Sequence, residues 1–301
     1  MKRWIVSCVL VTLWFLMPAA QAALNIFACT PEWGALAKEL AGDKASIYVA
    51  TNALQDPHHV EARPSLIARA RSADLVVCTG AELEIGWLPL VLTQAGNPKI
   101  QQGQPGYFEA ARQVTLLEVP TVLDRAQGDV HAAGNPHLQL DPRNIARIAA
   151  ALTERLAQLD PAQAADYRAR GKAFAERWQQ AIARWDKEAA PLKGMPIVVY
   201  HKNMTYLEHW LGLREVGALE PKPGLPPTTS SLGELLERLK KDPAKAVVRA
   251  AYNEPRAGEW LSGQANIPQV TLPFTVGGDE QSKDLFAFFD DTIARLLAAA
   301  K

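Results

Sequence analysis

Three of the six histidines lie in predicted loops next to strands or helices, where α/β proteins bind their ligands. His58 follows a strand-like run and precedes a helix, His137 stands just ahead of another helix, and His201 comes directly after the apolar run 197–200. In open α/β sheets, ligands bind beyond the carboxyl ends of the strands, where the loops converge. Imidazole suits zinc, copper, nickel and iron, and is a poor ligand for magnesium or calcium. The pattern therefore predicts a transition-metal site built from these three side chains.

A fourth ligand is expected from the last strand–helix junction, the Val-Gly-Gly-Asp-Glu sequence at 276–280. Its two glycines let the backbone turn closely, and Asp279 offers a carboxylate oxygen of the kind that zinc accepts. Glu280 is the alternative, since a shift of one residue leaves the pattern intact. A lone histidine or a Gly-Gly-Asp turn is usually only structural, so the prediction rests on the joint pattern.

The elements that must position these residues alternate between β-branched runs and helical periodicity, which indicates an α/β architecture with parallel sheets. Strands are predicted over 24–29, 45–50, 74–79, 114–117, 197–200, 246–249 and 269–272. Helices are predicted over 32–41, 64–72, 86–95, 204–211, 231–241, 256–263 and from 282 to the end of the chain.

Two Asp-Pro pairs predict the starts of further helices in the middle of the chain. Asp141 is the expected N-cap of a helix that begins at Pro142, and Asp160-Pro161 opens a stretch of about 30 residues without proline. At 1.5 Å per residue, that second helix would be roughly 45 Å long and would run along two lobes. The predicted organisation is an N-terminal α/β lobe over 23–158, a linking helix over 159–192 and a C-terminal α/β lobe over 193–301.

Composition sets outer limits on function. A chain of 301 residues is long enough for two domains with their own cores. Its 32 basic and 32 acidic residues cancel, which excludes the electrostatic footprint of a nucleic-acid binder. Three cysteines are too few for a disulfide scaffold or a thiolate zinc cluster.

Residues 1–22 are predicted to be a secretory signal peptide. Lys2 and Arg3 form a positive start, an apolar run follows over 4–17, and Ala-Gln-Ala at 20–22 supplies a cleavage pattern. Export would place the mature chain in the periplasm or outside the cell. Cys29 and Cys78 each end a strand-like run in that oxidising compartment. A disulfide and two buried thiols both fit, because spacing alone does not fix geometry.

With these motifs in place, the sequence resembles the zinc- and manganese-carrying solute-binding proteins of bacterial ABC transporters, the cluster A-I family. The motifs that carry the resemblance are Asp56-Pro57-His58 with Pro64-Ser65, Asn135-Pro136-His137 with Leu140-Asp141-Pro142, Tyr200-His201 with Tyr206 and Leu211-Gly212-Leu213, and Glu220-Pro221-Lys222-Pro223. They cover essentially the whole mature chain, including the long central helix.

The resemblance implies two α/β lobes bridged by one rigid helix, with a metal held between them by His58, His137, His201 and an acidic residue at Asp279. His58 is preferred to His59 because the proline six residues further on keeps the family's register. A histidine at the third position resembles the zinc type of site, whereas manganese favours oxygen donors. The implied protein is a receptor, not an enzyme: a monomer that captures Zn²⁺ and delivers it to an ABC permease and its ATPase.

Three other functions are compatible with parts of this pattern. A manganese or iron receptor would share the fold, and a periplasmic zinc chaperone or store would share the site. A secreted zinc hydrolase would need an open metal position and a general base, for which Glu280 or Glu61 could serve. Four protein ligands leave no such position, and no His-Glu-x-x-His motif is present.

The segment 124–134 departs from the family, because many zinc members carry a long loop rich in His and Asp there. Here it holds only Asp124, Asp129 and His131, which predicts a solvated loop or, alternatively, a weak capture contact. The short loop suggests that a periplasmic zinc chaperone could hand metal over to this protein.

His209 is expected on a helix surface. Asp279, on its glycine-flexible turn, is expected to move first on metal release.

Overall fold

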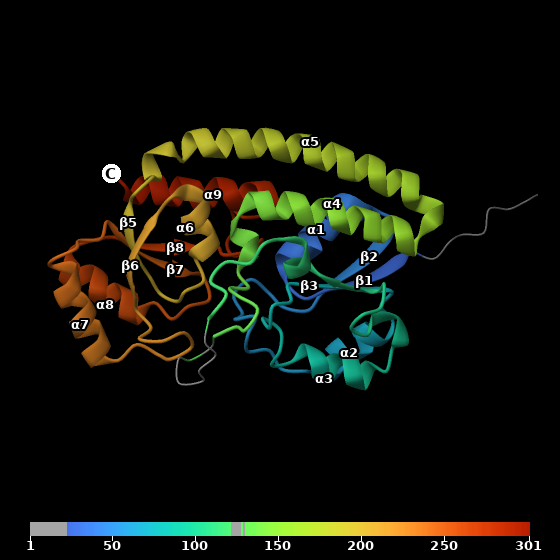
Figure 1. Cartoon of the computed structure of the whole chain (residues 1–301), viewed down its shortest axis with the longest axis horizontal. Helices are drawn as coiled ribbons and strands as arrows, with labels where there is room; N and C mark the ends of the chain where they lie inside the picture. The colour runs from blue at the N-terminus through green and yellow to red at the C-terminus, as the bar shows by residue number, and fades with distance from the viewer. Residues whose placement is uncertain (1–22, 122–127, 129) are drawn as a thin grey trace, which may run out of the picture.

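The computed structural model describes residues 23–121, 128 and 130–301, which form two α/β lobes side by side (Figure 1). The strands are β1 (Leu24–Ala28), β2 (Ala45–Val49), β3 (Leu75–Cys78), β4 (Tyr107–Glu109), β5 (Pro196–Val199), β6 (Arg214–Ala218), β7 (Ala246–Ala250) and β8 (Gln269–Leu272). The N-terminal sheet has the order β2-β1-β3-β4 and the C-terminal sheet the order β6-β5-β7-β8, all parallel. The predicted fold class is confirmed.

Helices cover both faces of each sheet, as parallel sheets require. They are α1 (Pro31–Ala41), α2 (Pro64–Arg71), α3 (Leu88–Ala95), α4 (Pro142–Leu159), α5 (Ala164–Glu188), α6 (Thr205–Leu211), α7 (Thr229–Leu239), α8 (Arg256–Ala265) and α9 (Leu285–Ala299). The predicted start of α4 is confirmed, since the Asp141 side chain accepts the Arg143 N–H at 2.9 Å. One continuous apolar core includes residues of α1, α4, α5 and α9 and so joins the two lobes.

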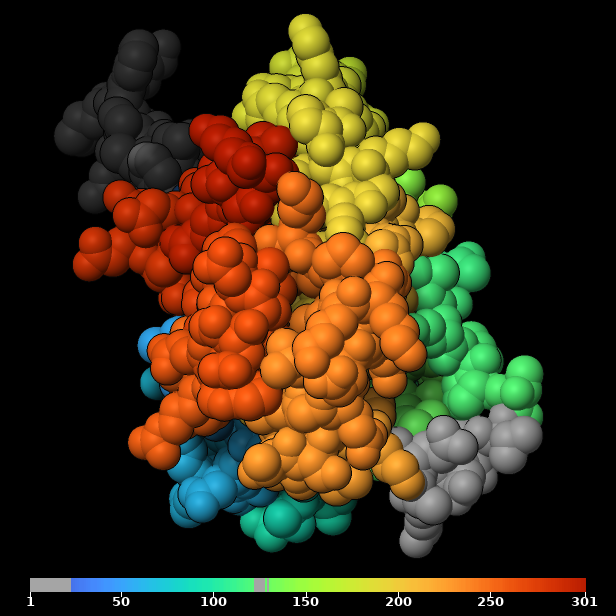
Figure 2. All heavy atoms as spheres, turned by 90° about the vertical axis from the view of Figure 1, so that its left-hand side faces the viewer, coloured from blue at the N-terminus to red at the C-terminus, as the bar shows by residue number. Residues whose placement is uncertain are grey.

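Helix α5 is the rod that connects the lobes. It has 25 residues, hence about 38 Å of length, and is preceded and followed by short 3₁₀ turns at Pro161–Gln163 and Ala190–Leu192. Figure 1 shows it arching over both lobes, with α4 and α9 beneath it. In Figure 2, which faces the C-terminal lobe, the yellow end of the rod and the red α9 lie next to each other.

Indole groups fix this rod to both lobes. Trp178 is fully buried and donates to the Pro142 carbonyl at 2.8 Å, at the start of α4. Trp185 is buried about two turns further along the same face of α5 and donates to Asp290 of α9 at 2.6 Å. The two rings meet edge to face with centroids 5.1 Å apart. The linking helix is therefore packed against both lobes and is a poor place for a flexible hinge.

Two edge strands differ from the predictions. The fourth strand of the first sheet is β4 at Tyr107–Glu109, and the predicted strand at 114–117 is irregular chain partly packed on the core. Strand β6 was not predicted at all. Each of β4 and β6 lies at an edge of its sheet, and each includes a charged residue that is at least partly exposed. Such strands lack the continuous apolar run that marks a central strand.

A disulfide joins Cys29 and Cys78, whose Cα atoms are 4.9 Å apart. Their strands are neighbours, since Ala28 of β1 pairs with Val77 of β3. Of the two states that spacing left open, a disulfide or two buried thiols, the structure therefore has the disulfide.

The predicted signal peptide lies outside the described residues. Among the residues that are described, no helix is both long and apolar enough to cross a membrane.

Replacing Trp178 with Ala should destabilise the protein by about 3–5 kcal/mol, because it opens a cavity under α5 and leaves the Pro142 carbonyl without its donor. Denaturant unfolding measures the loss. Lys172→Ala on the same helix is the matched control, since that side chain is 81% exposed and should change stability by less than about 0.5 kcal/mol. Equal effects of the two substitutions would contradict the role given to the rod.

Candidate metal centre

The structure brings together the three histidines that the sequence singled out. One nitrogen from each of His58, His137 and His201 lies within 4.8 Å of the others. Their ring centroids are separated by 5.2 Å (58 to 137), 5.9 Å (58 to 201) and 5.7 Å (137 to 201). His58 comes from the loop after β2, His137 from the turn before α4, and His201 from the end of β5. The cluster therefore lies between the lobes, with two imidazoles from one and one from the other.

Carboxylates orient two of these rings. Asp56 Oδ1 lies 2.8 Å from His58 Nδ1 and also accepts the His58 backbone N–H at 3.0 Å. Glu220 Oε2 lies 2.6 Å from His201 Nδ1 and accepts the Gly224 N–H at 2.8 Å. Such a carboxylate is the usual outer partner of a metal-ligating histidine: it accepts from Nδ1, fixes the tautomer and leaves Nε2 for the metal.

The sequence analysis did not predict the roles of Asp56 and Glu220. Asp56 had a local signal two residues before His58, but Glu220 stands 19 residues after its partner.

His137 is held differently, by its backbone and by burial. Asn135 Oδ1 accepts its N–H at 3.0 Å, while Asn135 Nδ2 donates to the Lys202 carbonyl at 2.8 Å in the other lobe. The ring is only 1% exposed, and Phe274 meets it edge to face at 5.6 Å. Burial, followed by the neighbouring imidazoles, lowers the pKa of His137 well below its usual value. The ring is therefore neutral, as a metal ligand must be.

His137 Nδ1 is also a buried atom with no hydrogen-bond partner. Buried polar atoms are nearly always paired, so an unpaired ring nitrogen in a cluster of imidazoles fits a site that takes a cation. The donor set is entirely nitrogen, which suits zinc better than manganese. The residues present therefore fit a zinc ion as cargo.

His131 lies beside this cluster, which fits the alternative of a weak capture contact better than that of a solvated loop. Its Nε2 is 3.3 Å from His58 Nε2, and the ring centroids are 5.3 Å apart. Ala132, the residue after His131, is held in place by a hydrogen bond from its N–H to Glu82 at 2.6 Å. An opening of about 390 Å³, lined by His131, His137 and His201 among others, gives access to the imidazoles. Asp124 and Asp129 lie outside the described residues.

Asp279, the expected fourth ligand, lies outside the group of three imidazoles in this structure. Its Oδ1 accepts the N–H groups of Gln281 and Ser282 at 3.0 and 2.9 Å, and its Oδ2 is paired with Arg295 of α9. Burial acts to raise the pKa of Asp279, but the Ser282 hydrogen bonds and the Arg295 charge hold it below its usual value. The alternatives Glu280 and His59 are exposed and are also outside the group of three. His209, on α6, lies near Arg143, as a surface residue would.

A second group of potential metal ligands in the described part of the chain is Cys29, Cys78 and Glu84. The two sulfurs form the disulfide and offer no thiolate. Glu84 is 3% exposed and accepts the N–H groups of Thr79 and Gly80 at 2.8 and 3.0 Å. Burial raises the pKa of Glu84 to about 7. This group is therefore a structural link between β1, β3 and the turn that follows.

A buried contact between the lobes supports the wall of the metal site. Glu32, at the start of α1, accepts hydrogen bonds from the hydroxyls of Thr30 at 2.6 Å and of Thr275 at 2.5 Å. Thr275 follows β8 in the other lobe, directly after Phe274, whose φ of 68° is unusual for a bulky residue. The hydrogen bond from Thr275 thus helps to hold the Phe274 ring against His137.

Comparison with known proteins places this geometry in a family. The family model described as zinc-uptake complex component A, periplasmic, matches residues 26–299. The metal ABC transporter substrate-binding lipoprotein ScbA of Streptococcus cristatus is 23% identical over 87% of this chain and 83% of its own length. The high-affinity zinc uptake system protein ZnuA of Brucella abortus is 28% identical, over 40% of this chain and only 36% of its own.

Solved structures share the fold. A crystal structure of ZnuA superposes with a TM-score of 0.77 at 21% identity, over 93% of this chain and all (100%) of that one. A manganese-bound periplasmic metal binding protein from Candidatus Liberibacter asiaticus gives a TM-score of 0.74 at 14% identity, over 92% of this chain and 99% of that one. At these sequence identities the similarity shows the two-lobed fold, and the identity of the bound metal depends on the residues of the site.

The buried carboxyl of Glu84 should make the protein less stable as pH rises from about 4.5 to about 7. The folded state keeps its proton up to the raised pKa of about 7, whereas the unfolded chain loses it near the ordinary value of 4.5. The folded state therefore binds more protons in this window, and the free energy of unfolding falls by up to about 3 kcal/mol. Denaturant unfolding at several pH values measures the slope.

In the Glu84→Gln variant that slope should be smaller, because the titrating group is gone. Glu237→Gln is the matched control, since Glu237 is an exposed carboxylate of α7 whose removal should leave the slope unchanged. A wild-type slope in Glu84→Gln would show that the carboxyl does not carry the pH dependence.

Proposed function

The chain belongs to the family of periplasmic zinc-uptake complex component A proteins, and we propose that it captures Zn²⁺ between its lobes for delivery to an ABC importer. The observation that carries this proposal is the cluster of His58, His137 and His201, whose nitrogens lie within 4.8 Å of one another. Carboxylates orient the rings of His58 and His201, and burial keeps the ring of His137 neutral. This arrangement is suited to holding a soft-to-borderline cation and releasing it intact.

The proposed ligand set is the three imidazoles with Asp279 in the fourth position. Asp279 must then exchange Arg295 for the metal, a change that the glycine turn before it permits, since Gly277 has a φ of 79°. A carboxylate also offsets the charge of a buried divalent ion, which a fourth neutral imidazole would not. His131 is the rival, because its Nε2 is already 3.3 Å from His58 Nε2.

Delivery follows from how the ligands are divided between the lobes. His58 and His137 belong to the N-terminal lobe, whereas His201 and Asp279 belong to the C-terminal one. A permease that binds both lobes and moves either set of loops would break the coordination shell. Asp279 is proposed to leave first, because Arg295 gives its carboxylate a ready partner. The proposed partners are the permease with its ATPase, and a periplasmic zinc chaperone that loads the site; the receptor is proposed to act as a monomer.

The site supports a receptor better than a zinc hydrolase. Glu61 and Glu280, the general bases that the sequence offered, are exposed residues outside the cluster. The carboxylates that do reach it, Asp56 and Glu220, are engaged with the imidazoles. A manganese or iron receptor remains the alternative within the family, and competition between buffered metals separates the two. A chaperone or store would bind zinc equally well but would not restore growth of a transport-deficient strain.

The wild-type mature protein should bind one Zn²⁺ per chain, and His201→Ala should weaken that binding by at least about 100-fold, since a lost ligand costs more than a lost outer partner. Elemental analysis and buffered zinc titration measure both. His209→Ala is the matched control, a histidine outside the cluster that should keep wild-type affinity. Tight zinc binding that is indifferent to His201 would overturn the proposed site.

The fourth ligand is decided by two further variants in the same titration. Asp279→Ala should weaken zinc binding by at least about 100-fold, because the metal loses its anionic ligand. His131→Ala should have a smaller effect. The reverse order would assign the fourth position to His131 and leave Asp279 as a structural partner of Arg295.

A further inference from the structure

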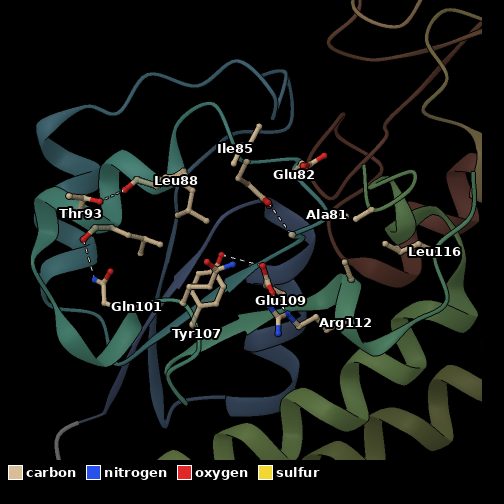
Figure 3. Close-up of a pocket in the computed structure, with 17 residues that line it drawn as sticks. Ala81, Glu82, Ile85, Leu88, Thr93, Gln101, Tyr107, Glu109, Arg112 and Leu116 are labelled. Carbon is tan, nitrogen blue, oxygen red and sulfur yellow. Dashed lines mark hydrogen bonds and ion pairs between the residues drawn. The ribbon is translucent and has the colours of Figure 1, made fainter. Parts of the chain in front are cut away.

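A second cavity lies in the N-terminal lobe, outside the imidazole cluster. Its volume is about 520 Å³, and it is bounded by the turn at 80–87, by α3 and by the end of β4. Figure 3 shows Ile85 and Leu88 on one side of it, facing Tyr107 and Glu109 on the other. This volume is within the range of small-molecule sites. Nothing in the zinc-receptor proposal uses this space.

The lining combines apolar walls with an excess of negative charge. Leu88, Leu92 and Leu116 contribute aliphatic surface, and the 66% exposed Ile85 forms an apolar lip. Three carboxylates, Glu82, Glu84 and Glu109, also line the cavity, against one guanidinium, Arg112, which pairs with Glu109. The Tyr107 hydroxyl donates to Glu109 at 3.5 Å. The cavity is therefore apolar in its body, and its ionisable groups include more carboxyl groups than cationic ones.

Glu84 gives the cavity its most unusual group. Its carboxylate is 3% exposed and is fixed by two backbone N–H donors, one on each oxygen. Each oxygen keeps a second lone pair that can accept from a ligand. Burial raises the pKa of this carboxyl to about 7, and a cation placed beside it would favour the ionised form.

We propose that this cavity is a second binding site, for a small organic cation that carries an amidinium, guanidinium or ammonium group on an apolar body. The apolar body would lie between Leu88, Leu92 and Tyr107, and the cationic head would meet Glu84 and Glu109. Planar cations with several N–H donors match carboxylates well, because their hydrogen bonds are charge-assisted. A neutral molecule of the same shape would not form charge-assisted hydrogen bonds with Glu84 and Glu109.

The turn that bounds the cavity also contacts the segments that carry His58 and His131. The Trp87 indole, at the end of the turn, donates to the Pro57 carbonyl at 3.1 Å, next to His58. Glu82, on the same turn, accepts the Ala132 N–H at 2.6 Å, next to His131. The turn also holds Ala81 and Glu82 at φ values of 49° and 68°, which costs strain in non-glycine residues. An occupant of the cavity would therefore contact the segment that supports two histidine loops.

Titration of the full mature protein with benzamidine tests the site, using its neutral isostere benzamide as the paired probe. Isothermal calorimetry or ligand-detected NMR should show saturable binding of one benzamidine per chain, with benzamide at least about tenfold weaker. Both experiments are run without added zinc, so their outcome is independent of the metal receptor. No saturable binding, or equal binding of the two probes, would overturn the proposal.

Three variants locate the bound cation. Glu109→Gln and Glu84→Gln should each weaken benzamidine at least about tenfold, and Ile85→Ser should weaken it without touching the buried part of the lobe. Glu237→Gln, an exposed carboxylate of the other lobe, is the control and should bind normally. Since Glu84→Gln can also disturb folding, Glu109→Gln and Ile85→Ser decide the result. Normal binding by both would place the probe elsewhere and overturn the site.

Discussion

The site depends on keeping a neutral imidazole buried where it lacks an ordinary partner. His137 is 1% exposed, and its Nδ1 has no hydrogen bond. An unpaired buried polar atom costs about 1–3 kcal/mol, so it persists only where the surrounding structure holds it firmly. Asn135 does so through the backbone and Phe274 through the ring face. The same burial lowers the pKa of this histidine, which keeps its lone pair available for a cation.

Such a site needs a rigid scaffold that holds the two lobes in a fixed relation when the ion binds. Helix α5 provides it, because its buried indoles bond to the start of α4 in one lobe and to α9 in the other. The apolar core beneath it continues from lobe to lobe. Movement is therefore left to the loops beyond the carboxyl ends of the strands. Those loops carry the histidines, the Asp279 turn and the Glu32–Thr275 contact.

Charge is arranged around the cluster and not within it. Asp56 and Glu220 each meet the far nitrogen of a histidine, so the cation site is framed by two carboxylates while the facing atoms are nitrogen. Asp279 is the third acid in the proposed scheme, and in this structure its carboxylate is paired with Arg295. This division lets the three imidazoles stay uncharged while a carboxylate is hydrogen-bonded to two of them.

The sequence by itself determined the α/β class, the central strands, the start of α4 and the three histidines at loop positions, because each follows from a local pattern of burial, capping or spacing. It did not determine the edge strands β4 and β6, whose half-exposed residues carry no continuous apolar signal. Only the tertiary structure decided that Cys29 bonds to Cys78, that Glu220 orients His201, and that Asp279 turns to Arg295. Those pairings join different elements within one lobe, Cys29–Cys78 in the first and the other two in the second, and their geometry exists only once each lobe has folded.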